Sequence, residues 1–248
     1  MTEGKIEAKN LSFKYPGPNE YLALKDLNFI VKPKEFTALL GPSGCGKSTA
    51  LHMASGLIKP TNGSILIDNK EINAPSKNVQ LVFQQPHLFP WKNIAENIAF
   101  PLKTSEAETK ALLEKYLSLT SLQEFKRFYP HQLSLGMQQK ASLARAFISN
   151  PSVLLMDEPF RSIDYQKRLE LHEFLLDLTK KLSKTVLFVT HDIDEAILLS
   201  DRILIMTPSP GAIKEEIKIN LDNRSTRLLT KPKFAKYKEK IIKGLRIP

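Results

Sequence analysis

The segment "GPSGCGKST" at residues 41–49 carries the residue types that bind a phosphate group. Its glycines let backbone N–H groups turn toward one point, where a following helix adds partial positive charge. Lys47 can reach the β- and γ-phosphates of a nucleotide, and the Ser48 hydroxyl can hold Mg²⁺. A chance glycine-rich turn is the alternative, but the apolar run at residues 36–40 and the helical spacing after the loop supply the strand and the helix that such a loop needs. The predicted nucleotide contacts are Gly41, Pro42, Ser43, Gly44, Cys45, Gly46, Lys47, Ser48 and Thr49.

Two adjacent carboxylates end a second apolar run, "VLLMDEP" at residues 153–159. Because neighbouring residues on a strand point in opposite directions, Asp157 and Glu158 are predicted to have different roles. Asp157 can hold Mg²⁺ together with Ser48, and Glu158 can orient and polarise the water that attacks the γ-phosphate. An acidic pair at a strand end is more often an ordinary turn, but its place after a phosphate loop favours a metal ligand and a base.

Two further polar side chains follow apolar runs of the same kind. His191, in "VTHD", can hydrogen-bond the transferring phosphoryl group and link it to Glu158, although a lone histidine at such a place is more often structural. Gln84 follows "VQLVF" and can contact Mg²⁺ or its water. The predicted catalytic residues are therefore Glu158 and His191, and the predicted metal ligands are Ser48, Gln84 and Asp157.

The elements that must position these residues predict an α/β fold. The runs "FTALL", "VQLVF", "VLLMD" and "VLFVT" are nearly all apolar, as strands buried on both faces of a parallel sheet are. Earlier runs follow one another closely with Pro and Gly turns, which predicts an antiparallel portion. Helical patterns begin at Ser105, where Glu108 predicts a capping box, and near Ser134. We therefore expect one domain over residues 1–248, with a helical subdomain inserted at about residues 86–150.

The composition is that of an ordinary globular protein, with 42% hydrophobic and 25% charged residues among 248. No apolar run approaches the roughly 18 residues of a membrane-spanning helix, and the first ten residues lack the apolar core of an export signal. Cys45 is the single cysteine, which excludes an internal disulfide and favours a reducing compartment. A cytoplasmic location is expected from these features.

The net charge of +10 is concentrated near the end of the sequence. Residues 222–248 hold nine basic and two acidic residues with aliphatic residues between them, which predicts a basic helical tail. This tail is either a solvated helical face or a surface close to an acidic bilayer or a membrane partner. Nucleic-acid binding is not predicted, because no recognised nucleic-acid module accompanies the charge.

These motifs, in this order, resemble those of the ATP-binding cassette (ABC) ATPases, the motor subunits of ABC transporters. The resemblance covers nearly the whole chain and rests on the phosphate loop, "FQQ" at Gln84, "LSLGMQQK", "LLMDEP", "SID" ending at Asp164, and "THD". It implies a P-loop NTPase core with a mixed parallel sheet, an antiparallel β portion and an inserted α-helical subdomain. It also implies ATP and Mg²⁺ as cofactors, with Tyr15 stacking on adenine. "LFPW" and "GMQQKASLARAF" make the chain most similar to importers for nitrate, sulfonate and taurine.

The resemblance further implies a mechanism that needs two cassettes packed head to tail. Ser134, the backbone N–H of Gly136 and Met137 would then contact the nucleotide held by the partner, and Asp164 would lie at the seam. The implied partners are a second cassette (identical or not), separate membrane permease subunits and, indirectly, a solute-binding protein, with no nucleic acid. ATP-driven closure of the dimer would drive uptake of a small solute, and the chain would be peripheral on the cytoplasmic face of the inner or plasma membrane.

The chain departs from the family pattern at two places. Leu135 stands where the family has glycine, and Arg161 adds a charge where "GAL" is common and this chain has "RSI". Trp91, the single tryptophan, is either a packing anchor for the helical subdomain or a contact with a permease helix.

Two other functions remain open from the sequence. One is an ABC ATPase of DNA repair or of the ribosome, although the second cassette or the long insertions usual there are absent. The other is a degenerate cassette that binds ATP and hardly hydrolyses it, which Leu135 suggests and the intact Lys47, Asp157, Glu158 and His191 oppose.

Overall fold

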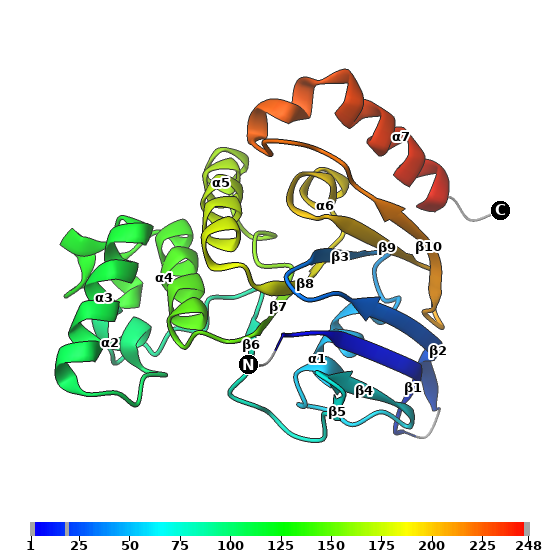
Figure 1. Ribbon diagram of the computed structural model, residues 1–248, viewed down its shortest axis with the longest axis horizontal. Coiled ribbons are helices and arrows are strands. Elements are labelled where there is room, and N and C mark those ends of the chain that lie inside the picture. Colours follow the sequence, from blue (N-terminus) through cyan, green and yellow to red (C-terminus); the bar gives the residue numbers. More distant parts are fainter. Residues whose placement is uncertain (1–2, 18–19, 246–248) are drawn as a thin grey trace.

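The computed structural model describes residues 3–17 and 20–245 and contains two β-sheets covered by helices (Figure 1). The end of the predicted basic tail, including Arg246, lies outside the described residues. The strands are β1 (Ile6–Tyr15), β2 (Tyr21–Val31), β3 (Phe36–Leu40), β4 (Asn62–Ile67), β5 (Lys70–Glu71), β6 (Val79–Val82), β7 (Val153–Asp157), β8 (Thr185–Thr190), β9 (Arg202–Met206) and β10 (Ile213–Lys218). The α-helices are α1 (Lys47–Ala54), α2 (Ile94–Ala99), α3 (Glu106–Thr120), α4 (Leu135–Ile148), α5 (Tyr165–Leu182), α6 (Ile193–Leu199) and α7 (Pro232–Leu245).

The larger sheet has the strand order β10-β9-β3-β8-β7-β6. The four strands predicted to be parallel are parallel neighbours in it. Strand β9 is a fifth parallel strand; its apolar run "RILIM" indicates a strand but was not placed among the parallel ones. Among its strands in residues 3–17 and 20–245, only β10 runs antiparallel, and it pairs with β9. Strands β3, β8 and β9 are buried along their whole length, which explains why their sequences are continuous apolar runs rather than alternating ones.

The smaller sheet is antiparallel, with the order β2-β1-β4-β5. Helix α1 lies between the two sheets, where Leu51 and Met53 pack with Leu39 of β3 and Ile65 of β4 in one hydrophobic cluster. The predicted α/β class, with a mixed parallel sheet and an antiparallel portion, is therefore confirmed.

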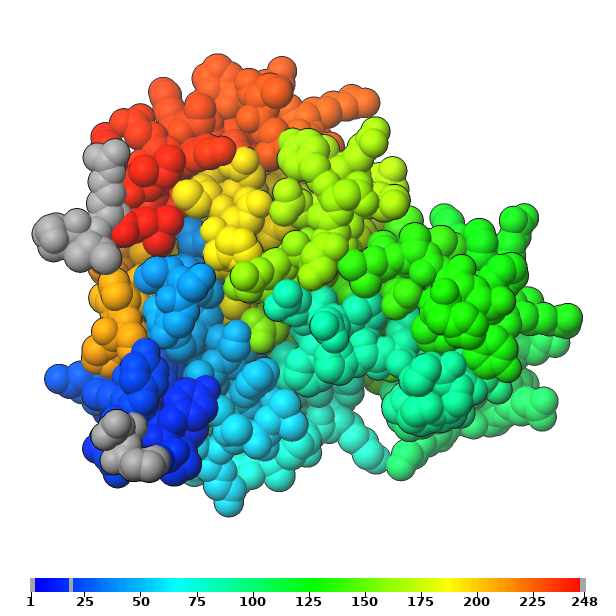
Figure 2. Space-filling model, turned by 180° about the vertical axis from the view of Figure 1, so that it is seen from behind, coloured from blue at the N-terminus to red at the C-terminus, as the bar shows by residue number. Residues whose placement is uncertain are grey.

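The opposite face of the parallel sheet is covered by α4, α5, α6 and α7. Side chains that alternate with those facing α1, such as Ala38 of β3 and Phe188 of β8, join this second cluster. Helices α2, α3 and α4 form a lobe at one end of the sheet, beside β6, and this lobe projects from the molecule in the view from behind (green in Figure 2). No strand interrupts the chain between β6 and β7.

The helix starts show one wrong prediction. Ser105 does cap α3, accepting a hydrogen bond from the Glu108 backbone N–H at 3.4 Å, but the reciprocal half of a capping box is missing. The complete box lies at α2, where Asn93 and Glu96 cap each other. Helix α2 has only six residues, too few for apolar periodicity to reveal it.

Helix α7 lies over α6 and the β9–β10 edge (Figure 1). Phe234 and Ile241 are buried against the core, and Lys238 forms an ion pair with Asp194 of α6 at 2.8 Å. Most of the remaining lysines of the tail are exposed. None of the helices within residues 3–17 and 20–245 combines the length and the apolar character that a membrane span requires.

Candidate nucleotide site

The parallel strands bring the predicted site residues to one edge of the sheet. In the register of the ladder, Leu40 of β3 pairs with Thr190 of β8, and Asp157 of β7 pairs with Val189. Because parallel strands end at the same edge, the phosphate loop, Glu158 and His191 follow directly from these positions. Segments that are more than 100 residues apart in the sequence therefore meet in one place.

The phosphate loop is held closed by Lys47. Its Nζ donates to the backbone oxygens of Gly41 and Pro42, each at 2.9 Å, and the side chain is nearly buried. Helix α1 begins at this lysine, so the loop ends on a helix N-terminus. Burial raises the pKa of the Cys45 thiol, partly offset by the charge of Lys47, so this cysteine is an inert thiol packed under the loop.

Ser48 and Asp157 face each other across the site. The Ser48 hydroxyl donates to Asp157 Oδ1 at 2.9 Å, and His52 Nε2 is 3.8 Å from Oδ2. Burial raises the pKa of Asp157, while the Ser48 hydrogen bond opposes the shift. This half-buried carboxylate next to a hydroxyl is an oxygen-donor pair that suits Mg²⁺.

The donor set fits Mg²⁺ only as a shared site. No group of three or more His, Cys, Asp or Glu side chains that could hold a metal occurs within residues 3–17 and 20–245. Mg²⁺ commonly takes one or two protein ligands and completes its shell with water and substrate phosphates, which agrees with what this edge offers.

Glu158 is separated from Asp157 by its backbone conformation. Its φ of 43° lies in the left-handed region, which costs about 1–3 kcal/mol in a residue other than glycine. The prediction from strand alternation was therefore incomplete. Glu158 lies one residue past the strand, and its left-handed backbone conformation directs its side chain away from Asp157. Its backbone N–H still donates to the Val189 carbonyl oxygen at 3.0 Å. Such strain at a strand end is typical of functional residues.

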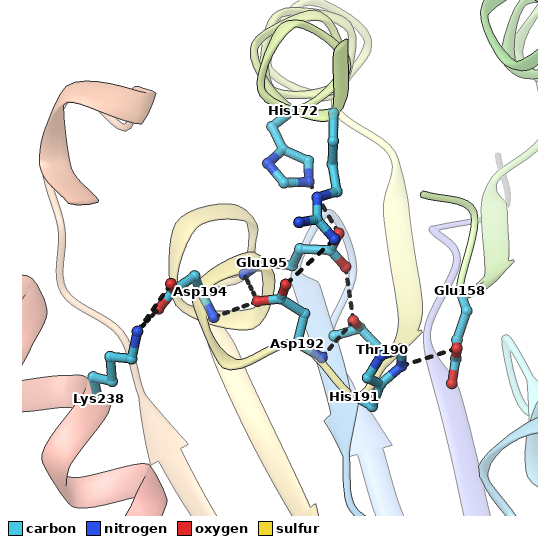
Figure 3. A network of polar contacts seen from close by, with 9 residues as sticks. Glu158, His172, Thr190, His191, Asp192, Asp194, Glu195 and Lys238 are labelled. Carbon is cyan, nitrogen blue, oxygen red and sulfur yellow. Dashed lines mark hydrogen bonds and ion pairs between the residues drawn. The ribbon is translucent and has the colours of Figure 1, made fainter. Parts of the chain in front are cut away.

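Glu158 receives two contacts on the same oxygen. His191 Nδ1 is 2.9 Å from Oε2 (Figure 3), and Arg161 NH1 donates to the same atom at 3.2 Å. The other carboxylate oxygen makes no hydrogen bond to any residue that the structure describes, which leaves it able to accept from water. The contact of Arg161 was not predicted, because the sequence offers no signal for a pairing of residues 158 and 161 across a turn.

A cavity of about 360 Å³ opens above the phosphate loop. Tyr15 and Tyr21 line one part of it, and Glu158 and Arg161 line another. Tyr15 is 45% exposed, and its hydroxyl lies 2.9 Å from Thr49 Oγ1, which ties the aromatic ring to the start of α1. Tyr21 was missed in the sequence, since it becomes a neighbour of Tyr15 only through the β1–β2 pairing.

Outside the phosphate loop, five predicted nucleotide contacts do not line this cavity. Gln84 is half-buried just after β6, and its side chain makes no hydrogen bond to any described residue. Ser134 is exposed and caps α4 by accepting from the Met137 backbone N–H at 3.4 Å. Asp164 caps α5, and the Lys167 backbone N–H holds the pKa of Asp164 below its usual range. The five are Gln84, Ser134, Gly136, Met137 and Asp164.

A parallel sheet whose strand ends carry a phosphate loop, a Ser–Asp pair and a Glu–His pair defines a P-loop nucleoside triphosphatase. The ABC transporter family model matches residues 24–161. A solved ATP-binding cassette, a dimer in a post-hydrolysis state bound to ADP and Pi, superimposes with a TM-score of 0.77 and 33% identity, covering 87% of this chain and 99% of that one. The chain belongs to the ABC transporter ATPases, and it is an ATP-binding and ATP-hydrolysing enzyme of that family.

Several relatives at higher identity are named as import proteins. The aliphatic sulfonates import ATP-binding protein of Bacillus anthracis is 41% identical over 89% of this chain and 87% of its own. The nitrate import ATP-binding protein of Synechocystis sp. is 37% identical over 91% and 88%, and the taurine import ATP-binding protein of Pelagibacter ubique is 37% identical over 94% and 91%. The predicted similarity to the nitrate, sulfonate and taurine group is confirmed.

Proposed function

We propose that this chain is the ATPase subunit of an ABC importer, in which ATP closes a pair of cassettes and hydrolysis reopens it. The observation that carries the proposal is the meeting of Lys47, Ser48, Asp157, Glu158 and His191 at one sheet edge. The names of the relatives support import, and the solute is a small anion or zwitterion such as nitrate, a sulfonate or taurine.

In this proposal the phosphate loop and Lys47 bind the phosphates of ATP, and the ring of Tyr15 stacks on adenine. The ammonium of Lys47 exchanges its two backbone acceptors for phosphate oxygens, which is a low-cost step because both are charge-assisted hydrogen bonds. Ser48, Asp157 and Gln84 hold Mg²⁺, which when bound neutralises charge on the phosphates.

Glu158 serves as the base that orients the attacking water. Its Oε2 is held by His191 and Arg161, so its remaining oxygen is the acceptor for water. His191 uses Nδ1 on Glu158 and retains Nε2 for a hydrogen bond to the transferring phosphoryl group. General-base positioning of this kind contributes about 10²–10⁴ in rate.

A second cassette completes the site. Ser134, Gly136 and Met137 at the N-terminus of α4, with Asp164 at the start of α5, belong to the half-site that each chain offers to its partner's ATP. The dimeric, ADP- and Pi-bound cassette supports this arrangement, and a twofold pair of identical chains has two equivalent sites.

The helical lobe is the surface for the permease. Trp91 is 70% exposed and Phe100 56% exposed, and both rings pack tilted against Phe89, with 5.5 and 4.5 Å between ring centroids. A tryptophan this exposed is a poor packing anchor, and exposed aromatic clusters are typical of interfaces. We infer that a cytoplasmic helix of the permease docks here, next to the segment that follows Gln84. The chain is then peripheral at the cytoplasmic face of the membrane, and a solute-binding protein acts through the permease.

A Glu158→Gln variant tests the function. The parent should hydrolyse Mg·ATP, and the variant should lose about 10²-fold or more in turnover while keeping ATP affinity. With saturating ATP the variant should form dimers in light scattering, because closure without hydrolysis traps them. Glu170→Gln, an exposed residue of α5, is the matched control and should behave like the parent.

Each contrary result has a defined meaning. If the variant stays monomeric with ATP, both alone and with its co-expressed permease, the transport-motor function is wrong. If the parent also traps dimers, the chain is a degenerate cassette rather than a working ATPase. Salt-sensitive DNA binding by the parent would favour an ABC ATPase that acts on nucleic acid.

A further inference from the structure

Hydrogen bonds of the Thr190 side chain hold the turn that carries His191. The Thr190 hydroxyl accepts from the Asp192 backbone N–H at 3.0 Å, so it spans His191. Asp192 in turn caps α6, with Oδ1 accepting from the N–H groups of Asp194 and Glu195 at 2.8 and 3.1 Å. Both neighbours of His191 are therefore fixed to α6, while the His191 side chain is half-exposed and has one polar partner among the described residues, Glu158.

The hydrogen bonds of Thr190 continue to the buried carboxylate of Glu195. Thr190 donates to Glu195 Oε2 at 2.7 Å, and His172 Nε2 of α5 lies 3.2 Å from Oε1 (Figure 3). Glu195 and His172 are each 4% exposed, and Thr190 is 1% exposed. Burying such groups is costly unless each is bonded, so a fully apolar packing of α5 on α6 would be simpler if stability alone mattered.

His172 joins the two segments that carry the proposed catalytic pair. Its ring packs edge-to-face on Phe160, with 5.1 Å between ring centroids, and Phe160 lies two residues after Glu158. Through Glu195 and Thr190 the same ring reaches the turn of His191. One buried side chain therefore contacts the supports of both Glu158 and His191.

We propose that Thr190, Glu195 and His172 are positioning residues, which hold Nδ1 of His191 at hydrogen-bond distance from Glu158. The proposal rests on the proposed function of these two residues in ATP hydrolysis. Because Asp164 caps the N-terminus of α5, the same network ties the His191 turn to the segment proposed to meet the partner cassette.

Thr190→Val is the central test, since valine keeps the shape of threonine and removes both hydrogen bonds. In the assembled dimer, kcat should fall by about 10- to 100-fold, the range expected when a reacting group is displaced by a distant change. KM for ATP should stay within about twofold, because the phosphate loop is untouched. Thr190→Ser, which keeps the hydroxyl, should restore turnover.

Thr185→Val is the matched control. Thr185 is on the same strand, is 1% exposed, and its hydroxyl accepts from the Lys34 backbone N–H at 2.8 Å. The Thr185→Val variant loses a buried hydroxyl at the opposite end of β8 from Thr190. Its Tm should therefore fall about as much as that of Thr190→Val, while its kcat should remain equal to that of the parent.

A second readout needs no activity. The ring ¹⁵N signals of His191, in the full chain without nucleotide, should differ from those of a free imidazole and move toward them in Thr190→Val. Glu195→Leu should produce the same shift, and His172→Gln, which keeps an N–H at the Nε2 position, should produce a smaller one than His172→Phe.

These readouts separate the inference from the proposed function. Parental kcat in a folded Thr190→Val chain, or parental His191 signals, would overturn the positioning role while leaving the ATPase function intact. The opposite combination is also informative: the His191 signals shift in Thr190→Val, but Glu158→Gln hydrolyses ATP at the parental rate. That result would support the positioning role of Thr190, Glu195 and His172 and overturn the catalytic role of Glu158.

Discussion

The two glycine-containing motifs of this chain differ in what their glycines contact. In the phosphate loop a Cβ on Gly46 would lie 2.6 Å from Leu24 Cδ2 and 3.0 Å from Ala23 O, and one on Gly41 would lie 2.9 Å from Cys45 Sγ. At the start of α4 a Cβ on Gly136 would meet only Lys167, at 3.7 Å, an ordinary van der Waals distance. The fold itself requires glycine in the loop, whereas nothing in the described part of the chain requires it at Gly136.

This difference locates the reason for Gly136 outside the chain. The phosphate loop is held by contacts within the chain, since the side chains of Lys47 and Ser48 both form hydrogen bonds to neighbouring residues. The N-terminus of α4 is capped by the exposed Ser134 and has backbone N–H groups free to bind another molecule. A half-site of this kind is expected where a second cassette supplies the nucleotide.

The largest expected effect is that of Gly46→Ala. Alanine at φ 94° is strained, and its Cβ would press on the backbone of Ala23, so the folded state should lose about 3 kcal/mol. Thermal unfolding should show a Tm lower by roughly 6–12 °C, and ATP binding should be lost with it. A parental Tm would mean that the loop can rearrange to accept a side chain.

Gly136→Ala should show the opposite pattern. Alanine is the better helix former by about 0.8–1 kcal/mol, so Tm should hold or rise slightly. ATP hydrolysis by the dimer should nevertheless fall about tenfold, a loss of roughly 1.4 kcal/mol, because the methyl group enters the space of the partner's nucleotide. Parental hydrolysis with a raised Tm would remove the argument that Gly136 serves a partner.

The same contrast explains what the sequence could predict. The loop and the strand ends were found because their chemistry is local: a strand, a glycine run, and an acid or histidine at the next position. The fold class followed from the buried apolar runs for the same reason. The capping box at Ser105 was half wrong, because a spacing of three residues permits the reciprocal bond but does not enforce it.

What the sequence missed depends on pairings between distant segments or on strained turns. Tyr21 enters the cavity only through the strand register, and Arg161 reaches Glu158 only because the backbone turns at φ 43°. The buried His172 is likewise indistinguishable in sequence from any polar residue of an amphipathic helix. Such contacts have no periodic or motif signature.

Leu135→Gly should have a smaller effect and sharpen the comparison. Leu135 is 38% exposed beside Gly136, so in the proposed dimer its side chain would lie at the seam with the partner's nucleotide. If the leucine hinders closure, its removal in the assembled complex should raise ATP turnover by roughly two- to threefold. An unchanged rate would show that the leucine is neutral in the seam.

The smallest expected effect is on stability, at Asp157. Burial raises the pKa of this carboxyl in the folded chain, so its ionised form costs stability at every pH above the ordinary value for Asp, about 3.9. Asp157→Asn keeps an acceptor for Ser48 and removes that cost. Without nucleotide and Mg²⁺, its Tm at pH 7 should be slightly above the parental one, and the difference should shrink as the pH falls toward 4.

Adding Mg·ATP should reverse that order, because binding to the folded state stabilises only the chain that can hold the metal. Asp157 and Gly136 are alike in that neither residue is needed for the stability of the isolated chain. In the proposed function, a bound cation explains the first feature and a partner chain explains the second. If Asp157→Asn were less stable than the parent at pH 7 without ligands, the Asp157 carboxylate would have a structural role in the folded chain. Gly136 at the start of α4 would then be the remaining feature that is explained by binding to another molecule.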